Sequence, residues 1–253
     1  RWAGGGQERD TTMGAASLTE PPMVAQAHSQ RAYARLAGFM YLFIIVCFAV
    51  GQLIGPSVAG NSTFGDASHR IAAAELLYRI GLLADVVGSL ATIPLIVALY
   101  VTLRPIDRNL ALMAALFRVI ETAADVVWLV AAFMVLQIHL AASHANGLDV
   151  TQLAGLADLA SGANAVGFAL SAAVSTLGSS LFFYLFLKSK YIPSILAVWG
   201  IFGAVWFTAV GFLSLLLPQL TDSALYGFLP ILIAELSTGL WLLIVGIKLP
   251  PSK

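Results

Sequence analysis

Residues 110–142 read LALMAALFRVIETAADVVWLVAAFMVLQIHLAA, a long apolar run that carries three charged side chains, Arg118, Glu121 and Asp125. They lie at positions i, i+3 and i+7, so they share one face of a single helix. A charged side chain at the centre of a bilayer costs about 2.5–3.5 kcal/mol on insertion scales. Three of them on one helix are tolerated only when they turn inward and compensate one another. This stretch therefore predicts a membrane helix that lines a polar interior within a bundle.

The composition of the whole chain is typical of an integral membrane protein. Of the 253 residues, 59% are apolar and only 10% are charged, and the mean hydropathy is +0.89. A soluble domain has roughly 25% charged residues. The formal net charge is zero and no basic run is present, which argues against nucleic acid as a partner. Cys47 is the only cysteine, so intrachain disulfides and a Cys-based metal cluster are excluded.

The hydropathy pattern predicts six membrane crossings, because roughly 20 apolar residues are needed to span about 30 Å of hydrocarbon. The predicted fold class is all-α, a polytopic six-helix transmembrane bundle over residues 31–248. Residues 1–30 are rich in Gly, Ala, Ser, Thr and Pro and predict a disordered cytoplasmic leader, and residues 249–253 are expected to form a short cytoplasmic tail. The expected crossings are 33–54, 71–103, 110–142, 159–187, 192–217 and 226–247.

The distribution of Lys and Arg predicts the orientation of the bundle. Nearly all of them fall at the N-terminus, in the second and fourth connections, or at the C-terminus, whereas the other connections hold only Arg70 beside three aspartates. The positive-inside rule then places both termini in the cytoplasm. The residues that carry this prediction are Arg31, Arg35, Arg104, Arg108, Lys188, Lys190, Lys248 and Lys253.

Buried polar groups on the second, third and sixth crossings predict a polar, ligand-sized cavity lined by these helices, and they supply the candidate site. Glu75 and Arg79 are i, i+4 partners near the external end of the second crossing, and they form either a headgroup-level salt bridge or part of a binding site. Asp85 lies deeper on that helix. Arg118 can neutralise Glu121, which leaves Asp125 to find Asn164 or another donor. The candidate ligand-binding residues are Glu75, Arg79, Asp85, Arg118 and Asn164.

Three carboxylates are candidates for catalysis: Glu235, Asp125 and Glu121. Glu235 is isolated in the sixth crossing, close to mid-membrane by residue counting. It either pairs with Arg79 or Arg118 across the bundle or carries a proton, because a lone buried carboxylate is costly. A glutamate that merely bonds a backbone carbonyl is the alternative.

Signals for metals and cofactors are weak. His139 and His144 are five residues apart, which places them on different faces of a helix, and no HxxxH or HExxH spacing occurs. Nucleotide-binding loops and a nucleophile elbow are absent from the sequence. We therefore expect neither a metal nor a cofactor.

Several short segments resemble one family of membrane proteins. They include Arg35 to Gly38, Glu75 to Gly81 with Asp85, Phe117-Arg118, Ser189 to Leu196, and Ala234-Glu235-Leu236 with Trp241. Together they are similar to the DUF4386 family of bacterial integral membrane proteins, over Arg35 to about Ile247. The resemblance implies a multi-pass protein of the bacterial plasma membrane and draws attention to Glu75, Arg79, Arg118 and Glu235. It implies no reaction.

Three hypotheses of function follow. A membrane-embedded enzyme would use the intramembrane carboxylates as acid or base on a lipid or isoprenoid-like substrate. A small proton- or cation-coupled transporter would use them as a relay, with Arg79 and Arg118 as counter-charges. A scaffold or binding protein would use them to hold helices in register. Membrane lipids and a lipid-like small molecule are the expected partners, and the sequence leaves the oligomeric state open.

Overall fold

The computed structural model describes residues 23–61, 63–144, 149–217 and 224–248. Within these residues the chain forms seven helices and no strand. Six of the helices are long and apolar enough to cross a membrane, which confirms the predicted six-helix bundle and makes this a multi-pass membrane protein. The helices are α1 (Met23–Ala59), α2 (Phe64–Ala73), α3 (Glu75–Leu103), α4 (Arg108–Ser143), α5 (Val150–Ser189), α6 (Ser194–Leu216) and α7 (Ala224–Ile244).

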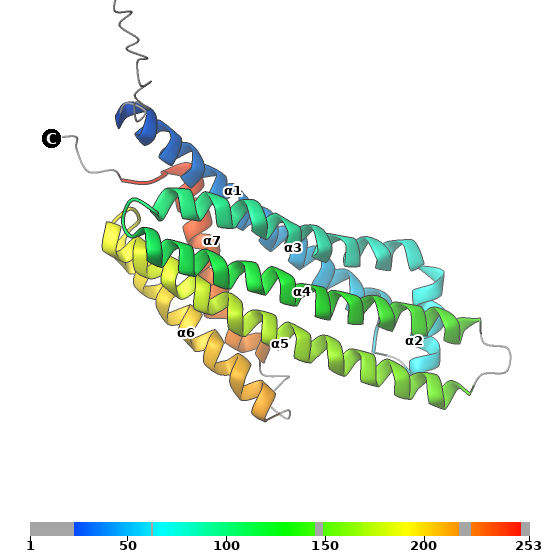
Figure 1. Ribbon diagram of the computed structural model, residues 1–253. Coiled ribbons are helices and arrows are strands. Elements are labelled where there is room, and N and C mark those ends of the chain that lie inside the picture. Colours follow the sequence, from blue (N-terminus) through cyan, green and yellow to red (C-terminus); the bar gives the residue numbers. More distant parts are fainter. Residues whose placement is uncertain (1–22, 62, 145–148, 218–223, 249–253) are drawn as a thin grey trace, which may run out of the picture.

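The six long helices close into a ring. α1 packs against α3 and α7, α3 also packs against α4, α4 against α5, α5 against α6, and α6 against α7. The short α2 lies across one end of the bundle, against α4 (Figure 1). We call that end the α2 end. The opposite end, where α1 begins and α7 finishes, is the terminal end.

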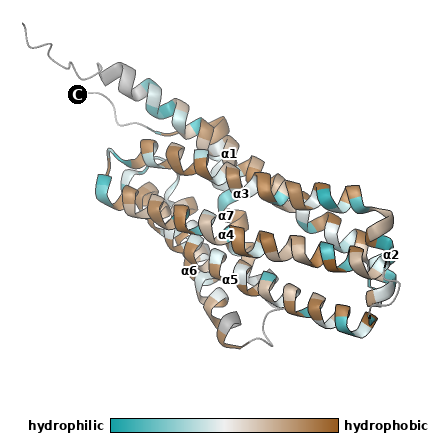
Figure 2. Cartoon of the chain, turned by 45° about the vertical axis from the view of Figure 1, so that its right-hand side comes forward, coloured by the Kyte–Doolittle hydropathy of each residue, from teal (hydrophilic) through white to brown (hydrophobic). Residues whose placement is uncertain are grey.

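The outside of the ring is apolar, as a lipid-facing surface requires. Figure 2 shows hydrophobic residues along most of each helix and hydrophilic ones gathered at α2 and at the turns. Large side chains such as Leu53, Leu76, Leu159 and Ile195 are more than 70% exposed. They have no protein partner among the described residues that would cover them, so lipid tails take that place.

Several predicted boundaries differ from the observed helices: the fourth crossing was expected from residue 159, but α5 starts at Val150. Two other boundaries differ for reasons that the structure shows. The expected second crossing started at residue 71, but that segment is split at Ala74, where φ is −120° and ψ 31°. Ile71 and Ala73 belong to α2, whose apolar side is buried against α4, so hydropathy alone merges the two helices. At the other boundary, α1 starts at Met23, directly after Pro21-Pro22, so residues 23–30 are helical although we expected them in the leader. Residues 1–22 and 249–253 lie outside the described residues.

The turns at the terminal end are fixed by specific caps. Asp107 caps α4 by accepting the N–H of Leu110 at 3.1 Å, and Lys188 of α5 lies 3.5 Å from its carboxylate. The bond from Leu110, helped by Lys188, holds the pKa of Asp107 below its usual range. Lys190, with φ 56°, ends α5, and Pro193 precedes α6. At the α2 end Asp149 caps α5 by accepting the N–H of Thr151.

Candidate functional site: a lateral cavity and two polar clusters

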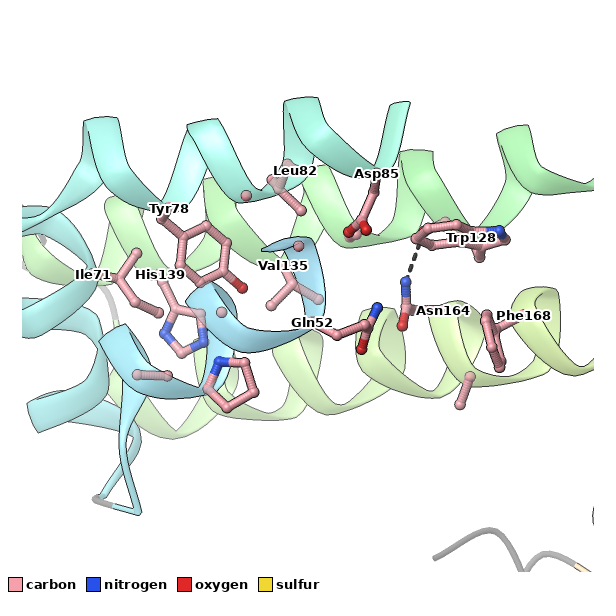
Figure 3. A pocket seen from close by; sticks show the side chains of 17 residues that line it. Gln52, Ile71, Tyr78, Leu82, Asp85, Trp128, Val135, His139, Asn164 and Phe168 are labelled. Atoms are coloured by element: carbon pink, nitrogen blue, oxygen red, sulfur yellow. Dashed lines mark hydrogen bonds between the residues drawn. The ribbon is translucent and has the colours of Figure 1, made fainter. Parts of the chain in front are cut away.

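A cavity of about 460 Å³ lies between α1, α3, α4 and α5, in the half of the bundle nearer α2 (Figure 3). Its volume falls within the range of about 300–1,000 Å³ that is usual for small-molecule sites. Most of its wall is apolar or aromatic. The polar side chains that line it are Gln52, Tyr78, Asp85, His139 and Asn164.

The cavity opens sideways between α1 and α5. These two helices make no substantial contact with each other, and α6 and α7 separate them only near the terminal end. Gly211, five residues before the end of α6, lies against Ala169 and Ala173 of α5. Beyond that level the rim residues Pro56 of α1 and Phe168 of α5 are exposed. The opening therefore faces the surroundings of the bundle at a level where the outer surface is still apolar.

Among the described residues, Asp85 is the only carboxylate in the cavity wall. The residue is 4% exposed, and its Oδ1 is buried with no hydrogen-bond partner among the described residues. Its carboxylate lies against Gly51 of α1, where an added Cβ would overlap it. Gly51 thus makes room for a charged group that the rest of the described protein leaves unpaired.

Trp128 forms the inner wall of the cavity and is held from three sides. Its indole N–H donates to Asp125 Oδ1 at 3.0 Å, and its backbone carbonyl accepts the amide of Asn164 at 2.8 Å. Its ring packs edge-on against Phe168, with centroids 6.0 Å apart. A rigid aromatic surface therefore closes the cavity towards the centre of the bundle (Figure 3).

Asp125 is the best-satisfied buried acid in the described protein. Besides Trp128, it accepts the hydroxyls of Ser89 on α3 and Ser171 on α5, both at 2.5 Å. The predicted partner Asn164 is not among these donors, because its amide reaches the Trp128 carbonyl instead. Asp125 does not line the cavity. Its observed contacts tie α3, α4 and α5 together and orient Trp128.

The outer part of the cavity is closed by α2. The Ser68 hydroxyl of α2 and Nδ1 of His139 on α4 lie 2.9 Å apart, and the Phe64 ring is tilted against the imidazole with the two ring centroids 4.8 Å apart. His144 lies at the end of α4 with Nδ1 2.8 Å from the Leu140 carbonyl, away from His139. Among the described residues, no group of three or more His, Cys, Asp or Glu side chains is placed to hold a metal ion.

A second polar group, the ion cluster, lies one to two turns from Asp125 towards the terminal end. It comprises Arg118, Glu121, Ser179 and Glu235. Arg118 Nε is 3.1 Å from Glu121 Oε2, an ion-pair distance, although the two atoms are not aligned for a hydrogen bond. Arg118 also donates to Ser179 at 3.4 Å, and Ser179 donates to Glu235 at 3.3 Å. Glu235 is thus connected to Arg118 through a serine and not by a direct ion pair.

The structure separates the predicted site residues into four places. Asp85 and Asn164 line the cavity, whereas Arg118, Glu121 and Glu235 share the ion cluster and Asp125 lies between the two groups. Glu75 and Arg79 pair with each other at 2.6 Å, with side chains 41% exposed, at the start of α3. This position fits the salt bridge at headgroup level, and the pair does not line the cavity.

Some residues of the site were missed by the sequence reasoning. Gln52, Tyr78 and Trp128 line the cavity, and Ser89, Ser171 and Ser179 supply donors to the buried acids. Gln52 carried a usable signal, because it is a polar amide inside the first apolar run. The serines carried none, since small hydroxyl residues are common in membrane helices whether or not they bond across them.

Comparison with known protein families finds a match. The sequence matches the family described as "Domain of unknown function (DUF4386)" over residues 36–246, most of the chain. The chain belongs to the DUF4386 family. The match confirms the resemblance seen in the sequence. No curated protein and no solved structure matches this DUF4386 protein in the corresponding comparisons.

Proposed function

We propose that this DUF4386 protein binds an amphipathic small molecule, taken from the lipid bilayer, in the cavity between α1, α3, α4 and α5. The observation that carries the proposal is a ligand-sized cavity that opens laterally and holds a buried, unpaired carboxylate, Asp85. Unpaired buried charges are costly, so proteins seldom keep them without use. The plasma membrane of a bacterium, with both termini in the cytoplasm, is the setting we propose for it.

The shape of the cavity supports a ligand with an apolar body and one polar end. Its wall is apolar along α1 and α4, with Gly55, Ala132 and Val135 among the lining residues. The polar groups are few and separated, as they are in sites where hydrogen bonds orient a mainly apolar molecule. A lateral opening between exposed Pro56 and Phe168 lets such a molecule enter without crossing water.

The two polar clusters support a binding role more than catalysis or transport. Glu121, Asp125 and Glu235 do not line this cavity. Asp125 already accepts three hydrogen bonds, which leaves it little capacity for proton transfer. Catalytic roles for these acids, and a relay through Arg118, stay predictions. Their contacts instead join α4 to α3, α5 and α7 around the base of the cavity.

A pair of glycine variants tests the proposal. A Cβ added at Gly55 meets nothing within 4 Å, and Gly55 lines the cavity, so Gly55→Phe is expected to fill it without a clash. Gly162 also has open space around it, but it is exposed on α5 and does not line the cavity. Gly162→Phe is therefore a matched control that adds the same ring outside the site.

The measurement is native mass spectrometry of protein released from lipid nanodiscs prepared from its own membranes. The wild type and Gly162→Phe should carry a molecule that survives removal of the surrounding lipid, and Gly55→Phe should lose it. Equal retention by all three proteins would contradict the proposal, and so would its absence from the wild type.

A further inference from the structure

The charge pattern of the cavity specifies its ligand further. Of the residues that the structure describes, one carboxylate, Asp85, lines the wall, and neither Lys nor Arg does. Arg79, one and a half turns before Asp85 on the same helix, is engaged by Glu75 at 2.6 Å. Arg118 is engaged by Glu121 and Ser179. Within the described residues, Asp85 therefore faces the cavity with no compensating cation.

Neighbouring donors are also committed elsewhere. The amide of Asn164 donates to the Trp128 carbonyl at 2.8 Å, and the indole N–H of Trp128 donates to Asp125 at 3.0 Å. His139 is paired with Ser68. These three side chains line the same cavity as Asp85, but each of them forms its hydrogen bond with a group other than Asp85. Gln52 and Tyr78 also line the cavity, but neither donates to Asp85 Oδ1, so a donor on a bound molecule can take that place.

Aromatic rings surround the same space. Tyr78, Trp128 and Phe168 all line the cavity, and Figure 3 shows Asp85 and Trp128 at its inner part. The faces of aromatic rings attract cations, most strongly where water is excluded. A carboxylate with an aromatic wall is a combination that suits an ammonium group, because both parts stabilise its positive charge.

We infer that the molecule bound in this cavity is a lipophilic amine, whose protonated nitrogen pairs with Asp85 while its apolar chain extends towards the opening between α1 and α5. This inference rests on the proposed binding function and adds the chemical class of the ligand. A neutral alcohol could fill the same volume, but it would bring no positive charge to stabilise the Asp85 carboxylate. An anionic fatty acid would place two like charges together in a low-dielectric site.

The test compares three probes with one chain length, namely decylamine, decan-1-ol and decanoate. Binding is followed as the rise in melting temperature of the detergent-solubilised protein at about pH 7, where an aliphatic amine is protonated. A ligand that binds only the folded state raises this temperature with its concentration. Gly55→Phe serves as the blank, because stabilisation that survives a filled cavity comes from the micelle or another site.

For the wild type, the apparent affinity for decylamine should exceed that for decan-1-ol at least about tenfold, as expected for a charge-assisted bond, with decanoate weakest. In Asp85→Asn the amine and the alcohol should bind equally, since the shape is kept and the charge is lost. Equal wild-type binding of amine and alcohol that Gly55→Phe abolishes would overturn the amine and leave the proposed function intact. If the wild type preferred decanoate and Gly55→Phe abolished that binding, the amine would likewise be overturned and the proposed function would stand.

Failure of all three probes, or stabilisation that Gly55→Phe does not change, would instead overturn the proposed function and the amine together. Should Asp85→Asn fail to fold, the ranking of the three probes on the wild type still decides the question. The experiment thus separates an error about the ligand from an error about the cavity.

Discussion

At the scale of single residues, the two aspartates near the cavity have opposite environments. Asp125 accepts three hydrogen bonds from side chains on three helices, whereas Asp85 accepts none from the described residues. Both are almost fully buried, at 5% and 4% exposure. The contrast indicates different roles for the two residues. Asp125 is bonded to partners within the protein, whereas Asp85 is available to contact a ligand.

Asp125→Ala is expected to destabilise the bundle without creating a new charge. The substitution leaves the hydroxyls of Ser89 and Ser171 and the indole N–H of Trp128 without their acceptor. Interhelical hydrogen bonds in membranes are worth about 0.6 kcal/mol on average, so the loss of the two bonds to α3 and α5 should cost roughly 1 kcal/mol, and the Trp128 N–H left without its acceptor within α4 should raise that cost. The free energy of unfolding, measured in mixed micelles against a denaturing detergent, checks this value.

Asp158→Ala is the matched control, because Asp158 is exposed on α5. It should change the unfolding free energy little. If the two alanine variants proved equally stable, the Asp125 contacts would not hold α3, α4 and α5 together. The same result would contradict the role of Asp125 in orienting Trp128.

At the scale of helices, the ring closes where α1 meets α7, and glycine makes that contact close. A Cβ added at Gly38 of α1 would lie 2.5 Å from the Leu243 nitrogen and 2.7 Å from the Gly239 carbonyl of α7. Both are backbone atoms, which cannot rotate away as a side chain can. Gly38 therefore permits the two helices to approach to backbone contact.

Gly38→Ala should lower the melting temperature, because α7 has to shift and overpacking of this kind costs about 1–3 kcal/mol. Gly239→Ala should have a smaller effect, since its nearest neighbour is the Cβ of Tyr41 at 3.0 Å. Gly162→Ala, with nothing within 4 Å, should be neutral or slightly stabilising because alanine favours helix. Scanning fluorimetry in one detergent gives this order, and a Gly38→Ala protein as stable as Gly162→Ala would contradict it.

Hydropathy predicted the six crossings because each crossing needs only a long apolar run in its own sequence, whichever helices it packs against. The inward face of α4 was predictable too, since Arg118 and Asp125 have only one tolerable side to face. The break at Ala74 was not, because α2 ends in apolar residues like those that follow it. The donors to Asp125 depend on the rotation of α3 and α5, which a single sequence does not encode in its periodicity.

The cavity was predictable only in outline. A polar, ligand-sized space was expected on the second, third and sixth crossings, yet the observed one is lined by α1 to α5. Its position follows from helix lengths: α5 has 40 residues and α6 only 23, so α6 leaves the outer part of α5 uncovered. How far α6 covers α5 depends on the assembled ring of helices. The local sequence around Gln52 or Asn164 therefore does not predict that a cavity lies there.

At the scale of the whole molecule, the two halves of the bundle differ in packing. Towards the terminal end the ring is filled by fully buried side chains such as Phe182, Phe186, Leu103 and Leu242. Towards the α2 end a smaller cluster around Ile71 and Leu136 packs beside the open cavity. The filled half provides a rigid base, and the open half provides the entrance for the proposed ligand.

The charges of the connections differ between the same two ends, and this difference predicts how the molecule is inserted. Arg104, Arg108 and Lys188 lie at the turns of the terminal end, together with Arg31 and Arg35 of α1 and Lys248 after α7, so this end should face the cytoplasm. The α2 end, and with it the mouth of the cavity, should then lie at the opposite leaflet. Any ligand would enter from that side of the membrane.

Two single-cysteine proteins test the orientation, because Cys47 is the only native cysteine and can be replaced by serine. Asn61 follows α1 at the α2 end, and Asn109 lies in the first turn of α4 at the terminal end; both are exposed and uncharged. Changing either to cysteine leaves the charge distribution intact. A membrane-impermeant maleimide should label Asn61→Cys in intact cells and Asn109→Cys only after permeabilisation. The reverse pattern would invert the molecule and move the entrance of the cavity to the cytoplasmic leaflet, while leaving the arrangement of the helices unchanged.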